Sequence, residues 1–382
     1  MHRFMRLRTL TVFVAIASAL ALFLPSAAAG TASVVVVADG LDNPRGIALR
    51  GDGAIFVAES GDGGARCEGH RAARICFGRS ASVTRISPSG AMRTIVKLPS
   101  LAGTDGFGSV GASDVAFEDG TFYIAMGGGP DAVQAVELFG RGARPFYDLA
   151  TAKPLRRVVD LYRYEARNDP AEDGIDSNPY AVARVDGGTL VADAGGNFLL
   201  LVTDEGAREL VATFPTQDLV GPDGTTVIPA QAVPNTVTVG PDGAWYVGQL
   251  TGFPFTPGSS RVWRIEPDAR GVACDADATT GPCTLFADGL TAIIDIAFAP
   301  DGTFYVLEIA KNGVLALEGG DPTPDDMLGA LLRMDGSTFT EIEGDELTTP
   351  TGLAIDADGR IFVTNFGIFP GQGQVVEVIP AA

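Results

Sequence analysis

The segment Asn43–Glu59 reads NPRGIALRGDGAIFVAE, which is an apolar run, a tight turn containing Asp-Gly, and a second apolar run. Asp-Gly between two such runs predicts a β-hairpin, because glycine adopts positive φ without steric cost. Five similar segments follow, with starts 55 to 68 residues apart. They read GASDVAFEDGTFYIAM from Gly111, NPYAVARVDGGTLVAD from Asn178, VPNTVTVGPDGAWYVGQ from Val233, AIIDIAFAPDGTFYVLE from Ala292 and TPTGLAIDADGRIFVTN from Thr349.

Repetition at this spacing predicts an all-β fold, a six-bladed β-propeller. A lone hairpin is marginal in water, so each copy must stack on its neighbours. The last repeat has a third strand near Gln374–Ile379 and then the chain ends, whereas Ser33–Ala38 (SVVVVA) precedes the first repeat without a blade of its own. We therefore expect the N-terminal strand to complete the last blade and close the ring, which removes two exposed sheet edges.

The first 29 residues have the features of a secretory signal peptide. Arg3, Arg6 and Arg8 precede an apolar run over Leu10–Leu24, and three alanines at 27–29 fit a cleavage site. The run is too short for a spanning helix. We expect a secreted, extracellular protein in which residues 30–382 form one propeller domain.

The chain is strongly acidic, with a net charge of −20 that becomes −23 once the three arginines of the leader are removed. This charge argues against nucleic acid or an anionic membrane surface as a partner. Solubility explains it more simply than a cationic ligand does. We expect a monomer without a membrane span.

The four cysteines form two local pairs, Cys67 with Cys76 and Cys274 with Cys283. An even count in an exported chain predicts disulfides. Three connectivities exist, and pairing between neighbours is favoured because each pair falls within one loop of one repeat. A zinc site is disfavoured, since the spacings do not match metal knuckles and the mature chain has a single histidine, His70.

In a propeller, the loops that join successive blades and the loops that join the second and third strands of each blade lie on the same face. Most long insertions of this sequence fall in these loops. We call this face the top face and regard it as the candidate functional face, because loops on a rigid scaffold usually perform the function. The insertions are Ser60–Ala81, Met126–Arg141, Arg167–Ser177, Phe214–Gln231, Leu250–Ser260 and Ile309–Leu328.

The six second strands end at this face, at the rim of the channel. Five of their last residues are polar, and we expect them to contact a ligand or, alternatively, each other and the loop backbone. The six residues are Glu59, Met126, Asp193, Gln249, Glu308 and Asn365.

Two top-face loops add candidate binding residues. Glu165, Asp176 and Asn178 bracket an acidic loop whose oxygen-rich composition suits Ca²⁺, and the alternative is a turn capped by Asx side chains. Phe253 and Phe255 follow the fourth hairpin, where they would either stack on a planar ligand or fill the gap between two blades.

Several phrases resemble the ScyD/ScyE family of exported bacterial propeller proteins. They are GASD at Gly111–Asp114, DSNPY at Asp176–Tyr180, ADAGGN at Ala192–Asn197 and VPNTVTVGPDGAWYVGQLTGFPF at Val233–Phe255. The resemblance covers essentially the whole mature chain. It implies a secreted, six-bladed, NHL-like propeller and no established activity.

We expect a non-enzymatic binding or scaffold protein with an unidentified small molecule or protein partner at the top face. The alternative is a metal-dependent hydrolase or lactonase that uses carboxylates at the channel mouth. Lactonases of the gluconolactonase type place a Glu, an Asn and an Asp on an axial metal, and here Asn235 and Asp193 would imitate two of these ligands. Nucleophilic catalysis has weak support, because His70 lies in a predicted disulfide loop and no nucleophile elbow is present.

Overall fold

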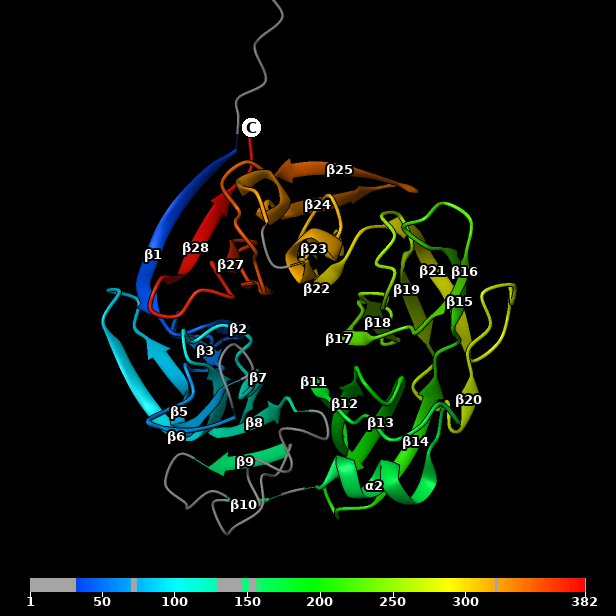
Figure 1. Ribbon diagram of the computed structural model, residues 1–382, viewed down its shortest axis with the longest axis horizontal. Coiled ribbons are helices and arrows are strands. Elements are labelled where there is room, and N and C mark those ends of the chain that lie inside the picture. Colours follow the sequence, from blue (N-terminus) through cyan, green and yellow to red (C-terminus); the bar gives the residue numbers. More distant parts are fainter. Residues whose placement is uncertain are drawn as a thin grey trace, which may run out of the picture.

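The chain folds as an all-β propeller whose sheets surround a central axis (Figure 1). The computed structural model describes residues 32–69, 74–128, 146–150, 156–157, 159–319 and 322–381. The expected signal peptide, residues 1–29, lies outside the described residues, as does His70.

Each of the six repeats forms the two inner strands of one sheet. The β2 sheet contains β2 (Pro44–Leu49), β3 (Ile55–Glu59) and β5 (Ile75–Ile86), with β4 (Arg66–Glu68) and β6 (Met92–Gly103) both paired to β5. The β7 sheet contains β7 (Ala112–Glu118), β8 (Thr121–Met126), β9 (Phe146–Ala150) and β10 (Arg156–Arg157). The β11 sheet contains β11 (Pro179–Val185), β12 (Gly188–Asp193), β13 (Phe198–Thr203), β14 (Arg208–Thr213) and β20 (Val272–Ala273).

The remaining sheets follow the same plan. The β17 sheet contains β17 (Pro234–Val239), β18 (Trp245–Gln249), β19 (Ser260–Ile265) and β21 (Cys283–Leu290). The β22 sheet contains β22 (Ile293–Phe298), β23 (Phe304–Glu308), β24 (Ala330–Asp335) and β25 (Thr338–Glu343). The β26 sheet contains β26 (Gly352–Ile355), β27 (Ile361–Asn365), β28 (Gly373–Ile379) and β1 (Ser33–Leu41).

The N-terminal strand closes the ring. β1 pairs antiparallel with β28, with Ser33 opposite Ile379 and Asp39 opposite Gln374. The predicted closure is therefore confirmed, and it joins strands from the two ends of the chain. The innermost strands then contact one another in the order β2, β7, β11, β17, β22, β26 and back to β2.

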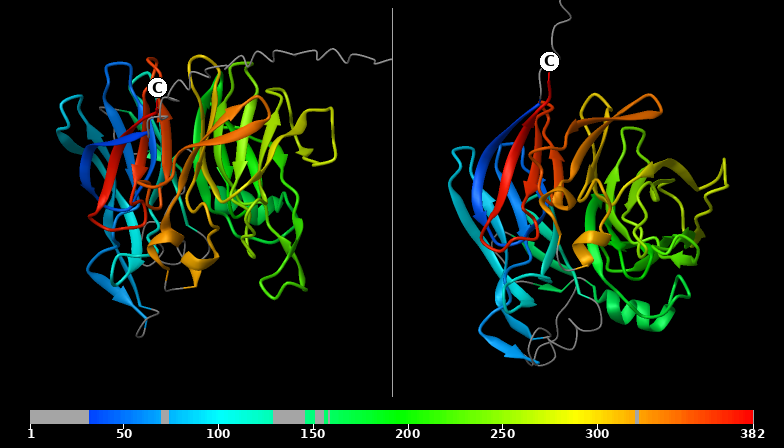
Figure 2. Two further views of the ribbon diagram at one scale, coloured as in Figure 1. Left: turned by 90° about the horizontal axis from the view of Figure 1, so that it is seen from above. Right: turned by 45° about the horizontal axis from the view of Figure 1, so that its top comes forward.

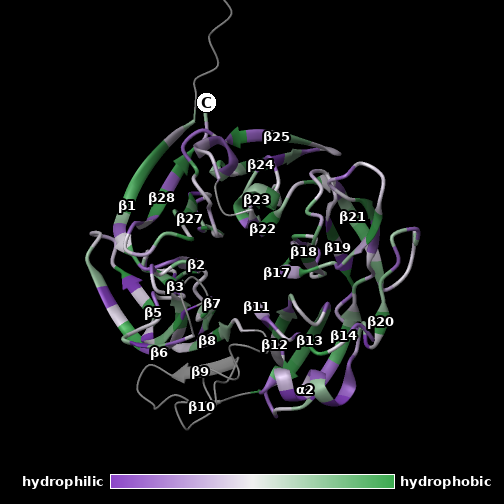
Figure 3. Cartoon of the chain, viewed as in Figure 1, coloured by the Kyte–Doolittle hydropathy of each residue, from purple (hydrophilic) through white to green (hydrophobic). Residues whose placement is uncertain are grey.

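The hydrophobic core is divided among the interfaces between neighbouring sheets. Trp263 and Leu199 belong to a cluster between the β11 and β17 sheets, and Phe56 and Phe122 to one between the β2 and β7 sheets. Four further clusters fill the other interfaces around the ring. Hydrophobic residues accordingly run along the strands of every sheet, while helix α2 is largely hydrophilic (Figure 3).

The top face holds most of the additions to the ring, as expected, and it lies at the bottom of the left panel of Figure 2. They are the β4–β5 arm, α2 (Leu161–Asn168), the two-stranded sheet of β15 (Gln217–Val220) and β16 (Val227–Ala230), α3 (Leu315–Glu318) and the 3₁₀ helix η2 (Pro324–Met327). No helix in the described part of the chain has the length and apolar character needed to cross a membrane.

Helix α2 was not anticipated from the sequence. Asp160 caps its first turn by accepting a hydrogen bond from the Arg163 N–H at 3.1 Å, and the helix ends at Asp169 in the left-handed conformation. The helix has no apolar periodicity that would predict it, because Leu161 is its only buried apolar residue.

Both predicted disulfides are present, Cys67–Cys76 and Cys274–Cys283. The first joins directly opposite residues of β4 and β5. The second closes a loop on the face opposite the top, and that loop contributes β20, which pairs in parallel with β14 of the neighbouring sheet. The second disulfide therefore stabilises a contact between two sheets.

Candidate functional site

The rim of the channel is built from one hydrogen bond that recurs in all six repeats. In five repeats the N–H directly after the second strand donates to the carbonyl of the first residue of the repeat, and in the sixth the donor is one residue further on, all at 2.9–3.1 Å. The donor and acceptor pairs are Ser60 and Asn43, Gly127 and Gly111, Ala194 and Asn178, Leu250 and Val233, Ile309 and Ala292, and Gly367 and Thr349. This bond fixes each top loop to the end of its inner strand.

The predicted strand-end side chains strengthen this rim. Glu59 accepts from the Asp42 N–H at 2.8 Å, Asp193 from the Asn178 N–H at 2.6 Å, and Glu308 from the Thr291 N–H at 2.7 Å. All three acids are buried. Of the two roles expected from the sequence, their contacts match the bond to the loop backbone, and a ligand contact for them remains a prediction.

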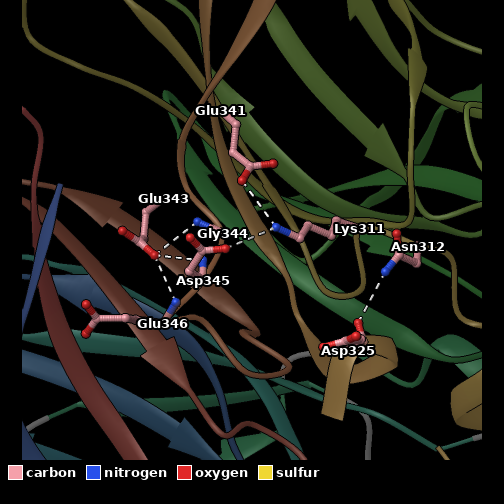
Figure 4. A network of polar contacts seen from close by, with 8 residues as sticks. All are labelled: Lys311, Asn312, Asp325, Glu341, Glu343, Gly344, Asp345 and Glu346. Atoms are coloured by element: carbon pink, nitrogen blue, oxygen red, sulfur yellow. Dashed lines mark hydrogen bonds and ion pairs between the residues drawn. The ribbon is translucent and has the colours of Figure 1, made fainter. Parts of the chain in front are cut away.

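Asn365 belongs to the same pattern, and Figure 4 shows the contacts that hold the loop after β25, which leads to its hydrogen-bond partner. The Glu343 carboxylate accepts from three successive backbone N–H groups, those of residues 344–346, at 2.9–3.1 Å. The Lys311 Nζ lies 3.2 Å from Glu341 Oε1 and 3.8 Å from Asp345 Oδ1. Asn365 then accepts from the Thr348 N–H at 2.7 Å, which fixes the entry into β26.

Gln249 is fully buried and has a different role. Its Oε1 accepts from the Trp263 indole N–H at 2.7 Å, and its Nε2 donates to the Thr251 hydroxyl at 3.1 Å. These bonds satisfy the polar atom of a buried tryptophan.

Four predicted residues come together beside α2, namely Glu165, Asp176, Asn178 and Asp193. Glu165 Oε1 accepts from the Asp176 N–H at 3.1 Å, whereas its buried Oε2 has no hydrogen-bond partner among the described residues. Burial and the nearby Asp193 raise the pKa of Glu165 to about 7. Burial likewise raises the pKa of Asp193 to about 6 against hydrogen bonds that favour its charged form.

The acidic loop that suggested Ca²⁺ is organised by hydrogen bonds. Asp173 accepts from the Asn197 amide at 2.7 Å, and Asp169 from the Gly174 N–H at 3.3 Å. The described residues contain no group of three or more His, Cys, Asp or Glu side chains arranged to hold a metal ion. These contacts match the alternative of a turn capped by Asx side chains.

Phe253 and Phe255 lie edge to face with ring centroids 6.1 Å apart. Phe255 packs against the hydrophobic cluster between the β22 and β26 sheets, as expected of a residue that fills a gap between sheets. Phe253 is 49% exposed and is available to a ligand or partner.

A pocket of about 160 Å³ opens at the channel mouth. Of the nine predicted binding residues only Asn178 lines it. Its lining comes from the inner strands and top loops of several sheets: Arg45, Ser60, Ser109, Val110, Gly111, Ser113, Gly127, Asn178, Tyr180, Ile309, Thr351 and Ile368.

Tyr180 lies across the channel under this pocket. It belongs to β11, yet it packs against the cluster between the β22 and β26 sheets, neither of which neighbours the β11 sheet. Burial raises the pKa of its phenol, and the nearby Arg45 partly opposes this effect. The pocket thus has an aromatic floor and a cation beside it.

Sequence reasoning missed two acids deeper in the channel, Asp114 and Asp295. Each is the fourth residue of its repeat, where the other repeats have Gly, Ala or Thr. Burial raises the pKa of Asp114 to about 7 and of Asp295 to about 6, and the charge of Asp295 adds to the effect on Asp114. An acid at a repeat position that is otherwise Gly, Ala or Thr was the sequence feature that could have identified these two residues.

No family model matches the chain, and no curated protein sequence matches it. Solved propellers match its fold. They include a protein of unknown function from Bacteroides thetaiotaomicron VPI-5482, with 12% identity, 91% of this chain and 76% of that chain covered, and a TM-score of 0.54. A putative oxidoreductase (glucose dehydrogenase) from Thermus thermophilus has 16% identity, 91% and 100% coverage, and a TM-score of 0.52.

A third similar structure is the soluble aldose sugar dehydrogenase from Escherichia coli in its apo-form. It has 12% identity, covers 92% of this chain and 100% of that chain, and has a TM-score of 0.50. Likeness at such low identity establishes the fold, and the ScyD/ScyE resemblance stays a prediction.

Proposed function

We propose that the chain is a secreted, six-bladed propeller of the ScyD/ScyE type that binds a small molecule at the mouth of its channel. Support for six blades comes from the closed order of the inner strands, the clusters between neighbouring sheets and the hydrogen bond repeated in every unit. Support for export comes from the two disulfides and the basic-then-apolar start of the sequence.

The observation behind the binding proposal is the pocket itself. A concave site with an apolar wall and a few converging polar groups is the usual form of a small-molecule site. Here loops from several sheets converge over Tyr180, and the recurrent rim bonds make the site preformed. A preformed pocket loses little conformational entropy when a ligand binds.

Binding is favoured over hydrolysis by the chemistry of the lining. The lining residues that the structure describes include no Asp, Glu, His or Cys. The carboxylates expected for a lactonase, Glu59, Asp193 and Glu308, are instead engaged by backbone N–H groups of the rim. A hydrolase at this mouth would have to bring such carboxylates to a pocket whose described lining does not include them.

The test uses purified residues 30–382 incubated with a metabolite extract, followed by buffer exchange and mass spectrometry of the retained molecules. Val110→Trp fills the pocket from its rim and should abolish retention. Val239→Trp adds the same bulk at an exposed site at the far end of β17 and should leave retention intact. A ligand retained equally by both variants would contradict the proposed site, and a ligand recovered chemically altered would favour the hydrolase.

A further inference from the structure

We infer that the pocket binds a small monocarboxylate with an apolar body, through the guanidinium of Arg45. This inference rests on the proposed function and names the class of ligand. Arg45 is the one Lys or Arg among the described lining residues. Its Nη1 donates to the carbonyls of Gly367 and Pro44, and its Nη2 lies 3.4 Å from the Ser109 hydroxyl.

Arg45 has no carboxylate partner within the described part of the chain, although acids greatly outnumber basic residues. Half-buried Arg50 and exposed Arg360, in contrast, do pair with acids. Arg45 is half-buried, and burial lowers its pKa, which reflects the cost of partly withdrawing this cation from water. A bound anion would compensate that cost.

The open edge of the guanidinium fits a carboxylate. Among the described residues Nε of Arg45 has no hydrogen-bond partner, and Nη2 has only the long contact to Ser109. The same Nε and Nη2 edge binds both carboxylate oxygens of Asp52 in Arg50 and of Glu377 in Arg360, at 2.6–2.8 Å. Two-point binding of this kind is the strong mode of arginine–carboxylate recognition.

The rest of the lining favours an apolar body on that carboxylate. Ser60 and Ser113 already donate their hydroxyl groups to the carbonyls of Ala112 and Pro179. Thr351 likewise donates its hydroxyl to the Pro44 carbonyl, so Ser109 and Asn178 are the other polar side chains of the described lining. The apolar part of the wall is Val110 with two isoleucines, Ile309 and Ile368, and the ring of Tyr180. A phosphate or a sugar would need more free donors than this wall provides, because each buried polar atom needs its own partner.

The experiment measures dissociation constants by isothermal titration calorimetry for benzoate, butyrate and hexanoate. Benzamide and phenyl phosphate serve as neutral and phosphate counterparts of benzoate. At least one carboxylate should bind, and Arg45→Gln should weaken it at least about tenfold, as expected for charge-assisted hydrogen bonds. Arg45→Lys should recover only part of the loss, because lysine lacks the planar fork.

Arg93→Gln is the matched control, since Arg93 is exposed on β6, outside the pocket lining. Four outcomes would each overturn the inference. They are equal binding of benzoate and benzamide, tighter binding of phenyl phosphate than of benzoate, unchanged carboxylate affinity in Arg45→Gln, and no binding of any carboxylate. If the retained metabolite is neutral and Val110→Trp abolishes its retention, the pocket is supported but the carboxylate class is overturned. Thermal melts of every variant verify folding.

Discussion

Asp114 and Asp295 occupy the same position of two inner strands, β7 and β22, which are third neighbours in the ring and so face each other across the channel. Each accepts a hydrogen bond from the inner strand of the next sheet, Asp114 from the Val182 N–H at 2.9 Å and Asp295 from the Leu353 N–H at 2.7 Å. Each also accepts from the N–H that follows it, at 2.8 Å. The two acids therefore satisfy edge N–H groups of inner strands that have no neighbouring strand on the channel side.

This arrangement predicts opposite behaviour for two conservative substitutions. Asp114→Asn removes one of two acceptor oxygens and points an amide N–H at a backbone donor. It should lower the free energy of unfolding by about 1–3 kcal/mol, the cost of an unsatisfied buried donor. Glu308→Gln keeps its carbonyl for the Thr291 N–H and relieves a buried carboxylate, so stability at pH 7 should be unchanged or higher.

Urea unfolding at pH 7 measures both variants. Glu205→Gln, at an exposed turn, is the control for loss of one negative charge. A Glu308→Gln variant that loses as much stability as Asp114→Asn would contradict this assignment of the bonds.

The buried acids also predict the direction of the pH dependence. Burial raises the pKa of Asp114, Glu165 and Glu308 to about 7, and of Asp193 and Asp295 to about 6. In the unfolded chain the same groups lose their protons near pH 4. Between about pH 4.5 and pH 7 the folded protein therefore holds more protons, so stability should fall as the pH rises and level off above pH 7.

Melting temperatures across pH 4.5–8 test this trend. Glu308→Gln should reduce the slope, since one group contributes at most about 1.4 kcal/mol per pH unit. Exposed acids whose pKa is lowered to about 2, such as Asp52 and Asp223, change the stability only below pH 4.5. Stability that rises from pH 4.5 to pH 7 would contradict the prediction.

Ring closure predicts a strong asymmetry between the two ends of the chain. Deleting residues 30–38 from a protein of residues 30–382 removes most of β1 and exposes an edge of β28, so the melting temperature should fall sharply. Deleting residues 380–382, which follow β28, is the control and should have little effect. Equal melting temperatures for the two deletions would contradict closure by β1.

Much of the fold could be predicted because its determinants are local and repeated. Asp-Gly turns between apolar runs fix each hairpin. A spare strand before the first repeat and a missing outer strand in the last repeat together imply closure. The pairing of Cys67 with Cys76 and of Cys274 with Cys283 follows from loop length in the same way. The parallel pairing of β20 with β14 could not be predicted, since it depends on how one loop meets the next sheet.

The site was harder to predict because its chemistry depends on contacts between repeats. The convergence of second strands at the rim was correct, but no local pattern indicates that loop N–H groups lie within 2.8 Å of Glu59 and Glu308. The close approach at Gly46, where a Cβ would collide with Asp114 Oδ1, could not be predicted either. No local sequence feature distinguishes Arg45 from a surface arginine, because its place in the pocket depends on top loops from other repeats.

The two disulfides should differ in what they stabilise. Replacing Cys274 and Cys283 by Ser frees the loop that holds β20 on β14, where the Cys274 N–H donates to the Thr213 carbonyl at 2.9 Å. Both cysteines are buried beside Trp263 in the cluster between the β11 and β17 sheets. We expect a loss of about 2–3 kcal/mol by the chain-entropy estimate and faster amide exchange in β14 and β20.

Replacing Cys67 and Cys76 by Ser is the matched comparison, because it opens a loop of the same length. These cysteines lie in the β4–β5 arm, and faster exchange should be confined to β4 and the first residues of β5. Hydrogen exchange followed by mass spectrometry measures both double variants. Unchanged exchange in β14 after loss of the second disulfide would show that the contact between the β11 and β17 sheets does not depend on Cys274–Cys283. Faster exchange in β14 after loss of the first disulfide would show that the effect is not specific to Cys274–Cys283.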